Sequence, residues 1–254
     1  MERMRNPGKM DEKTCRLIGL MKRTDGRDKS FRIVQYSSML LVCALEKGGT
    51  ASSLVGSMKL AMSTTRKSLR LVKMVENFRE LFLVVFRRKN KGVKIMNRLL
   101  GVLAVAAEVL YFYYDHLVWL HRISVRALPK PEAVRVESMS SYMWLSNATF
   151  EFFRQLHLLS ETLRNQRKDR LSASNEGSGE GEKRALFELD KKYSTAMRKQ
   201  VVAVVKQGSD VVTATCESNL LWFLTERQTR TIEGISGLLA SLIGFYGVWL
   251  DVKI

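Results

Sequence analysis

The scarcity of proline is the feature that most constrains the fold of this chain. Only three prolines occur in 254 residues, at Pro7, Pro129 and Pro131. Proline interrupts the interior of a helix because it lacks a backbone donor and clashes with the preceding turn, so long proline-free stretches are open to helix formation. Pro129 and Pro131 flank a single lysine and predict a turn. We therefore predict an all-α fold.

The net charge of the chain indicates which class of partner it binds. Lys and Arg number 42 against 25 Asp and Glu, a formal net charge of +17, which predicts an anionic partner. Nucleic acid and anionic lipid head groups both qualify. The basic residues are dispersed from Lys9 to Arg230 among apolar residues rather than packed into one block. This pattern favours anionic membrane lipids and argues against nucleic acid.

Residues 1–98 are predicted to form an N-terminal amphipathic helical region. A first helix is expected to open near Asp25 and Asp28, which suit the positive end of a helix dipole, and to end before Gly48-Gly49. Its apolar residues recur at helical spacing and are predicted to share a face that packs in a bundle: Phe31, Val34, Leu41 and Leu45.

The segment from Ser52 to Phe86 is predicted to be one basic amphipathic helix. Its cations fall in one narrow sector of the helical wheel, with apolar residues spread over the opposite side. Such a helix can lie in the head-group plane, where each cation contributes ~1 kcal/mol of attraction to an anionic membrane surface. The alternative is the solvated face of a bundle helix. The residues predicted to bind lipid are Lys59, Arg66, Lys67, Arg70, Leu71, Val72, Lys73 and Val75.

Residues 99–171 are predicted to hold a hydrophobic helix followed by an aromatic, interfacial one. The run from Leu99 to Leu120 is long enough to cross a hydrocarbon layer of ~30 Å. It carries two acids, Glu108 and Asp115, which are seven residues apart on one face and are expected to point to protein or water. A spanning helix with a polar seam and a buried or interfacial helix both fit this pattern.

The remaining chain is predicted to contain a linker and an anchor. Residues 172–182 are rich in Gly, Ser and Glu and predict a flexible linker. Residues 183–254 are predicted to be helical and to end in a membrane anchor over 234–250. This anchor segment contains no charged residue. Small residues at helical spacing predict close contact with another helix, at Ser236, Gly237, Ala240, Ser241 and Gly244.

Motifs of enzymatic chemistry are missing from the sequence. We find no GxxxxGK[ST], GxGxxG, HExxH or GxSxG pattern. His116 and His121 are five apart, which places them on different faces of a helix and disfavours a metal pair. We expect no enzyme activity, no cofactor and no metal.

Four stretches, in order along the chain, resemble the peroxin-11 family of peroxisomal membrane proliferation proteins. They are Gly26-Arg27-Asp28-Lys29 with Gln35-Tyr36; Arg66-Lys67-Ser68-Leu69-Arg70-Leu71 with Lys73; Asp115-His116 with Trp119 and Trp144-Leu145-Ser146; and Gly237-Leu238-Leu239-Ala240-Ser241 through Tyr246 and Trp249. The resemblance implies an integral protein of the membrane of peroxisomes or a specialised peroxisome-type organelle. It further implies cytosolic termini and a role in elongating and dividing the organelle together with its fission machinery.

Three hypotheses of function follow. In the leading one, homo-oligomers concentrate the basic amphipathic helix, which wedges into one leaflet and bends the membrane. The second is a channel or transporter for small metabolites, in which Glu108 and Asp115 line a polar path. The third, an RNA-binding helical protein, depends on net charge alone and leaves the hydrophobic C-terminal segment unexplained.

Overall fold

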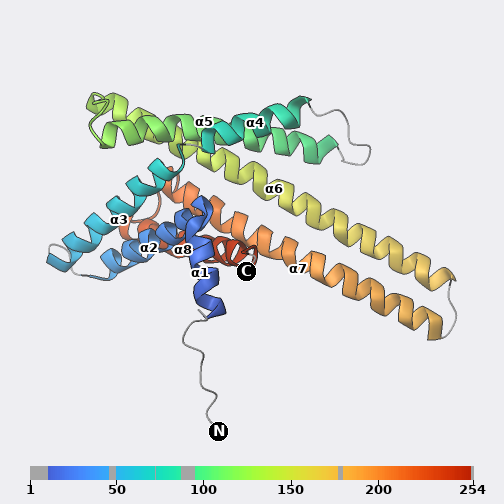
Figure 1. Cartoon of the computed structure of the whole chain (residues 1–254). Coiled ribbons are helices and arrows are strands. Elements are labelled where there is room, and N and C mark those ends of the chain that lie inside the picture. Colours follow the sequence, from blue (N-terminus) through green and yellow to red (C-terminus); the bar gives the residue numbers. More distant parts are fainter. Residues whose placement is uncertain (1–10, 46–49, 72, 87–94, 177–179, 253–254) are drawn as a thin grey trace, which may run out of the picture. The chain divides into compact units, whose positions relative to one another are not determined.

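A computed structural model describes the chain except for residues 1–10, 46–49, 72, 87–94, 177–179 and 253–254. The described residues form eight helices and no strand (Figure 1), so the all-α prediction is confirmed. The helices group into two compact units, one made of residues 1–70 and 224–254 and the other of residues 71–223. We call them unit 1 and unit 2.

Unit 1 is built from two segments that lie far apart in the sequence. It contains α1 (Glu12–Lys22), α2 (Thr24–Ala44), α3 (Thr50–Leu69) and α8 (Glu226–Leu250). One extended residue, Arg23, separates α1 from α2. At the start of α2, a Cβ on Gly26 would lie 2.1 Å from the carbonyl oxygen of Leu20, so only glycine fits this corner. α8 packs along α2, and its first turn is closed by a capping box between Thr225 and Gln228.

The predicted packing face of α2 is wrong toward the C-terminal end of the helix, although Phe31 and Val34 are half-buried. Leu41 and Leu45 are 53% and 37% exposed, whereas Arg32, Tyr36 and Met39 are buried. The spacing identified residues that share a face, but it did not reveal which face meets the neighbouring helices. α2 packs between α3 and α8, and its polar side chains find their partners there.

Unit 2 is built along one long helix. It contains α4 (Lys73–Phe86), α5 (Ile95–Arg122), α6 (Lys130–Glu176) and α7 (Glu180–Glu217). α6 has 47 residues and is therefore about 70 Å long. α5 and α7 both pack against α6, as Figure 1 shows, and α4 packs against α5.

Two predicted boundaries are wrong. The basic helix expected over Ser52 to Phe86 is two helices, because α3 ends at Leu69 and the chain turns before α4. The linker expected at 172–182 is mostly helical, since only residues 177–179 separate α6 from α7. Ser, Asn and Glu cost a helix no more than ~0.7 kcal/mol each. Contacts between the antiparallel α6 and α7, including Tyr193 with Asp169, support the helical ends. The two compact units accordingly do not divide the chain at that linker.

Two helices in the described part of the chain are long and apolar enough to cross a membrane, judged by length and composition. They are α5 and α8. They contain the two hydrophobic segments that the sequence predicted, and each begins several residues earlier than expected.

Candidate functional site

A buried carboxylate joins α2 to α3. Asp28 of α2 is 4% exposed, and its Oδ1 lies 3.1 Å from Nε of Arg66 and 3.2 Å from Nε of Arg70. Its Oδ2 lies 3.6 Å from Nζ of Lys29. Nη1 of Arg66 also donates to Oε1 of Gln35 at 2.7 Å. We call this group, together with Arg32, the Asp28 cluster.

The charges of the Asp28 cluster act strongly on one another. Burial raises the pKa of Asp28, but attraction to Arg70, Arg66 and Lys29 outweighs burial and holds that pKa well below its usual range. Burial lowers the pKa of Arg66, repulsion from Arg70 lowers it further, and attraction to Asp28 only partly offsets both effects. The carboxylate is therefore ionised, and positive charge exceeds negative charge in the cluster.

Stretches that carry the family resemblance meet at this cluster. Asp28 belongs to the first stretch and Arg66 and Arg70 to the second, and they form one ion-pair network across 38 and 42 residues of chain. Asp28 and Gln35 were not predicted as site residues from the sequence. A usable signal was present, because Asp28, Arg32 and Gln35 lie at spacings of four and three on one face of a helix.

The small residues of α8 form a close contact with α2. Gly237, Ala240 and Ser241 are buried, and Ser236 and Gly244 are half-buried. A Cβ on Gly237 would lie 2.5 Å from ring atoms of Tyr36, and one on Gly234 would lie 2.6 Å from Leu40. The small-residue face thus serves a helix contact within the chain.

The residues predicted to bind lipid do not share one outward face. Arg66 is buried, and the side chain of Arg70 is 13% exposed. Both side chains turn toward Asp28, because charge-assisted hydrogen bonds to its carboxylate are strong. The other members divide as follows: Lys59 and Lys67 are half-exposed in α3, Leu71 and Val75 are exposed, Val72 lies outside the described residues, and Lys73 begins α4 with a side chain outside the description.

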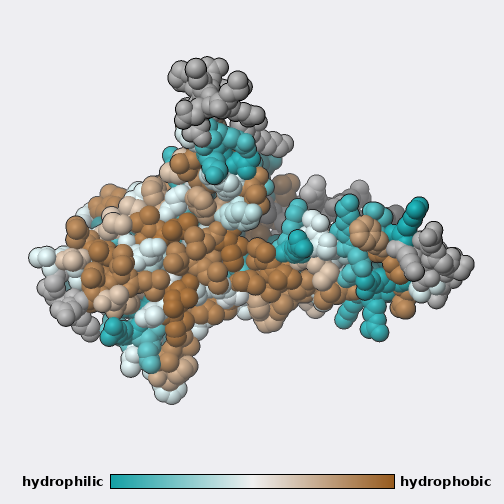
Figure 2. Space-filling model, turned by 90° about the horizontal axis from the view of Figure 1, so that it is seen from below, coloured by the Kyte–Doolittle hydropathy of each residue, from teal (hydrophilic) through white to brown (hydrophobic). Residues whose placement is uncertain are grey.

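Large apolar side chains cover much of the outside of the helices. On α4 they form a stripe at spacings of three and four, in which Val75, Phe78 and Phe82 are 69%, 49% and 61% exposed. The outer side of α8 likewise exposes Ile235, Leu239, Leu242 and Tyr246. Figure 2 shows hydrophobic side chains spread widely over the face in view. Extensive exposed apolar surface is typical of a protein that meets a membrane or another protein.

The two acids of α5 differ in their surroundings. Asp115 is 1% exposed, and Glu108 is half-buried. α6 packs over this part of α5, where Nδ2 of Asn147 donates to the carbonyl oxygen of Ala104 at 2.9 Å. Asp115 therefore lies in the interior of unit 2.

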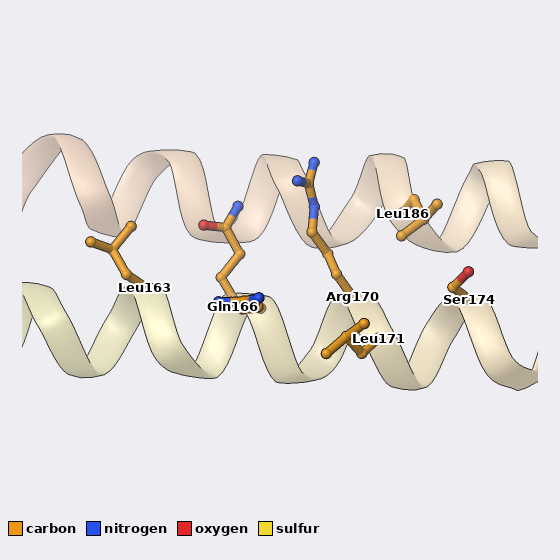
Figure 3. Close-up of a pocket in the computed structure, with 7 residues that line it drawn as sticks. Leu163, Gln166, Arg170, Leu171, Ser174 and Leu186 are labelled. Atoms are coloured by element: carbon orange, nitrogen blue, oxygen red, sulfur yellow. The ribbon is translucent and has the colours of Figure 1, made fainter.

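A shallow groove of about 390 Å³ lies on the α6–α7 hairpin (Figure 3). Arg170 on its edge lies 2.5 Å from Oδ2 of Asp190, and this hydrogen bond lowers the pKa of Asp190. Nearby, the hydroxyl of Tyr193 donates to Asp169, which raises the pKa of Tyr193. These polar contacts hold the two helices together at this end of unit 2.

The fold and surface define a class of protein: all-helical in the described residues, with two candidate membrane-spanning helices and many exposed apolar side chains. The chain belongs to the peroxisomal biogenesis factor 11 (PEX11) family, whose model matches residues 15–249. The predicted resemblance is therefore confirmed.

Relatives in plants and amoebae match over nearly the whole chain. Peroxisomal membrane protein 11B of Arabidopsis thaliana is 25% identical over 235 residues, covering 92% of this chain and 96% of the relative. Peroxisomal membrane protein 11 homolog of Dictyostelium discoideum is 25% identical over 247 residues, covering 92% and 93%. Peroxisomal membrane protein 11-4 of Oryza sativa subsp. japonica is 26% identical over 237 residues, covering 92% and 96%. No solved structure matches this chain.

Proposed function

We propose that this protein is a non-enzymatic, integral protein of the peroxisomal membrane that promotes elongation, division and proliferation of the organelle. It inserts an amphipathic helix into the cytosolic leaflet, homo-oligomers concentrate that helix, and the fission machinery acts on the elongated membrane. Family membership and the names of the relatives support the organelle and the membrane.

The observation that carries this proposal is the apolar stripe of α4. Val75, Phe78 and Phe82 are exposed along one side of a helix whose other described residues include Glu76 and Arg79. Fully burying a side chain of this kind yields ~1.5–3 kcal/mol, so three of them supply several kcal/mol for insertion. A helix whose apolar side is buried at the boundary between head groups and acyl chains expands one leaflet and bends it.

The cationic part of the mechanism differs from the sequence prediction. Arg66 and Arg70 form ion pairs with Asp28, and these pairs stabilise the packing of α3 against α2. Attraction to anionic lipid then falls to basic residues outside the Asp28 cluster, such as Lys59 and Lys67, and salt weakens it.

Contacts within unit 1 support the proposed orientation, and its exposed apolar surface supports the proposed assembly. Nη2 of Arg23 donates to the carbonyl oxygen of Asp251 at 3.1 Å, and Arg16 lies over the ring of Trp249, so the two ends of unit 1 lie together. This neighbourhood supports placing both termini on one side of the membrane, the cytosolic side. The outer apolar side of α8 remains available to lipid or to a second copy of the chain.

Replacing Val75 and Phe78 with serine is expected to abolish tubulation of anionic vesicles by the reconstituted protein, because the stripe loses two of its three apolar members. In cells, peroxisomes should fail to elongate although the variant still reaches them. Phe187→Ser, at a site 67% exposed on α7, is the matched control and should elongate peroxisomes normally. Normal elongation by a correctly localised double variant contradicts the proposal.

A metabolite channel is the second candidate, favoured by the buried Asp115 and half-buried Glu108 of α5. If the protein acts by membrane remodelling, the double variant Glu108→Gln with Asp115→Asn should leave vesicle tubulation unchanged. Conductance in planar bilayers separates the two candidates. A conductance of the wild-type protein that disappears in the double variant assigns a polar path to these acids, and a conductance that persists removes them from any pore.

A further inference from the structure

Two aromatic side chains are exposed in the short connection between α7 and α8. Trp222 is 87% exposed and Phe223 is 67% exposed, and Trp222 is the most exposed large apolar side chain among the described residues. Their rings lie edge to face, with centroids 6.1 Å apart. Aromatic side chains of this size normally bury a large apolar area. The folding of the described residues therefore does not account for this pair of rings.

The backbone on both sides of the pair is well defined. α7 ends in a Schellman motif, with Asn219 at a positive φ of 53°. The N–H of Leu220 donates back to the carbonyl oxygen of Thr215, which is the hydrogen bond that defines this motif. α8 begins with the capping box of Thr225. Only residues 220–224 lie between the two caps, so the rings are carried by a short connection and not by a long loop.

The length of α8 predicts where this connection lies when the helix is embedded in a bilayer. α8 has 25 residues and is therefore about 37 Å long. A bilayer is about 40–45 Å thick with its head groups, and about 30 Å of this is hydrocarbon. Residues 234–250 carry no charge and suit the hydrocarbon, whereas the preceding turns of α8 carry charges that suit head groups: Glu226, Arg227, Arg230 and Glu233.

The aromatic pair lies close to that charged end of α8. Phe223 precedes Glu226 by three positions, so its backbone is within about 10 Å of the start of the helix. This is the level of the head groups, where amphipathic aromatic rings are enriched in membrane proteins. The bilayer is thus the partner that the position of the pair favours.

We propose that Trp222 and Phe223 form an aromatic anchor, which inserts into the head-group layer of the leaflet at the N-terminal end of α8. The indole suits this depth, because its ring is apolar and its N–H can donate to a lipid oxygen. Arg227, exposed on the first turn of α8, adds attraction to anionic lipid. The inference rests on the proposed function, since it requires an embedded α8, and it adds a second membrane contact besides the stripe of α4.

The test measures the depth of Trp222 in the full chain, reconstituted into nanodiscs of phosphatidylcholine and phosphatidylserine. The other three tryptophans are replaced by phenylalanine, so that all tryptophan fluorescence comes from Trp222. Lipid brominated near the head group should quench this fluorescence about twofold or more, and lipid brominated near the end of the acyl chain should quench it less. Acrylamide should quench it severalfold less than it quenches N-acetyltryptophanamide in water. The replaced residues are Trp119, Trp144 and Trp249.

Two results of this experiment overturn the proposal. Strong quenching by acrylamide with none by either lipid leaves the ring in water. Protection from acrylamide and from both lipids assigns the ring to a protein contact, such as a second copy of the chain. Failure of the proposed function is detected separately, because a chain that carbonate releases from membranes is not integral. A carbonate-resistant chain with Trp222 in water keeps the proposed function and lacks the anchor.

A second measurement needs no tryptophan replacement outside the pair. Trp222→Ser with Phe223→Ser should speed trypsin cleavage after Arg227 about tenfold in nanodiscs, whose two surfaces are both open to the protease, because the connection leaves the membrane. Phe187→Ser is the matched control, since Phe187 is also 67% exposed, and it should change the rate less than about twofold. Unchanged cleavage in the double variant overturns the proposal.

Discussion

Asp28→Ala is expected to destabilise the protein by about 3–5 kcal/mol, because it leaves the buried Arg66 without its counter-charge. Hydrogen exchange should accelerate in α3 and in the N-terminal half of α2, and the thermal midpoint in detergent should fall. Glu12→Ala removes a carboxylate from an exposed pair with Arg16 and should cost no more than about 1 kcal/mol. Equal effects of the two substitutions would show that the cluster adds nothing to stability.

Two further measurements identify the cause. Asp28→Leu with Arg66→Met removes both charges and should recover much of the loss, since an apolar pair avoids the cost of a lone buried charge. The pKa of Asp28 is lowered by folding, so its contribution is present in full above the unfolded pKa of about 3.9 and disappears as pH falls through the folded value. The difference between wild type and Asp28→Ala should therefore stay constant between about pH 5 and 8.

Gly237→Val is expected to separate α8 from α2. Its Cβ would lie 2.5 Å from two ring atoms of Tyr36, whose side chain is 2% exposed and cannot swing aside without opening the core. Overpacking of this kind costs about 1–3 kcal/mol, and more where backbone must move. A disulfide between cysteines introduced on α2 and α8 should form in the wild-type background and fail in the variant.

Gly247→Val tests whether valine in α8 is itself harmful. A Cβ at Gly247 meets nothing within 4 Å, so this variant should keep wild-type stability and crosslinking. A second-site change, Tyr36→Ala, should partly rescue Gly237→Val by vacating the space that the new side chain needs. Normal crosslinking of Gly237→Val alone would contradict the close contact of the two helices.

The sequence predicted helices well because periodicity and the lack of proline are local properties. α5 and α8 were both found as hydrophobic segments, and the small residues of α8 were identified as a contact face. The break between α3 and α4 was missed, since nothing in the local pattern around Arg70 marks it. Arg70 makes its ion pair with a residue 42 positions away, and single-sequence periodicity carries no record of such a partner.

The second feature that the sequence did not predict is the direction in which each amphipathic face points. A helical wheel groups Arg66 with Arg70 but does not say whether they meet solvent, lipid or protein. We expected both to lie in the head-group plane, yet both turn toward Asp28, while Leu41 of α2 and Leu45, which caps the end of α2, are exposed. Exposed apolar residues are common on protein surfaces, so helical spacing alone does not identify the packed face of α2.

The order in which the chain is synthesised has a consequence for unit 1. Its α2 and α3 emerge early, whereas α8 follows only after residues 71–223. At about 5–20 residues per second, that interval is roughly 8 to 30 s. The Asp28 cluster can close during this time because both its helices are present, but Tyr36 has no Gly237 to receive it. Assembly of unit 1 is therefore a late event, completed when α8 packs against α2.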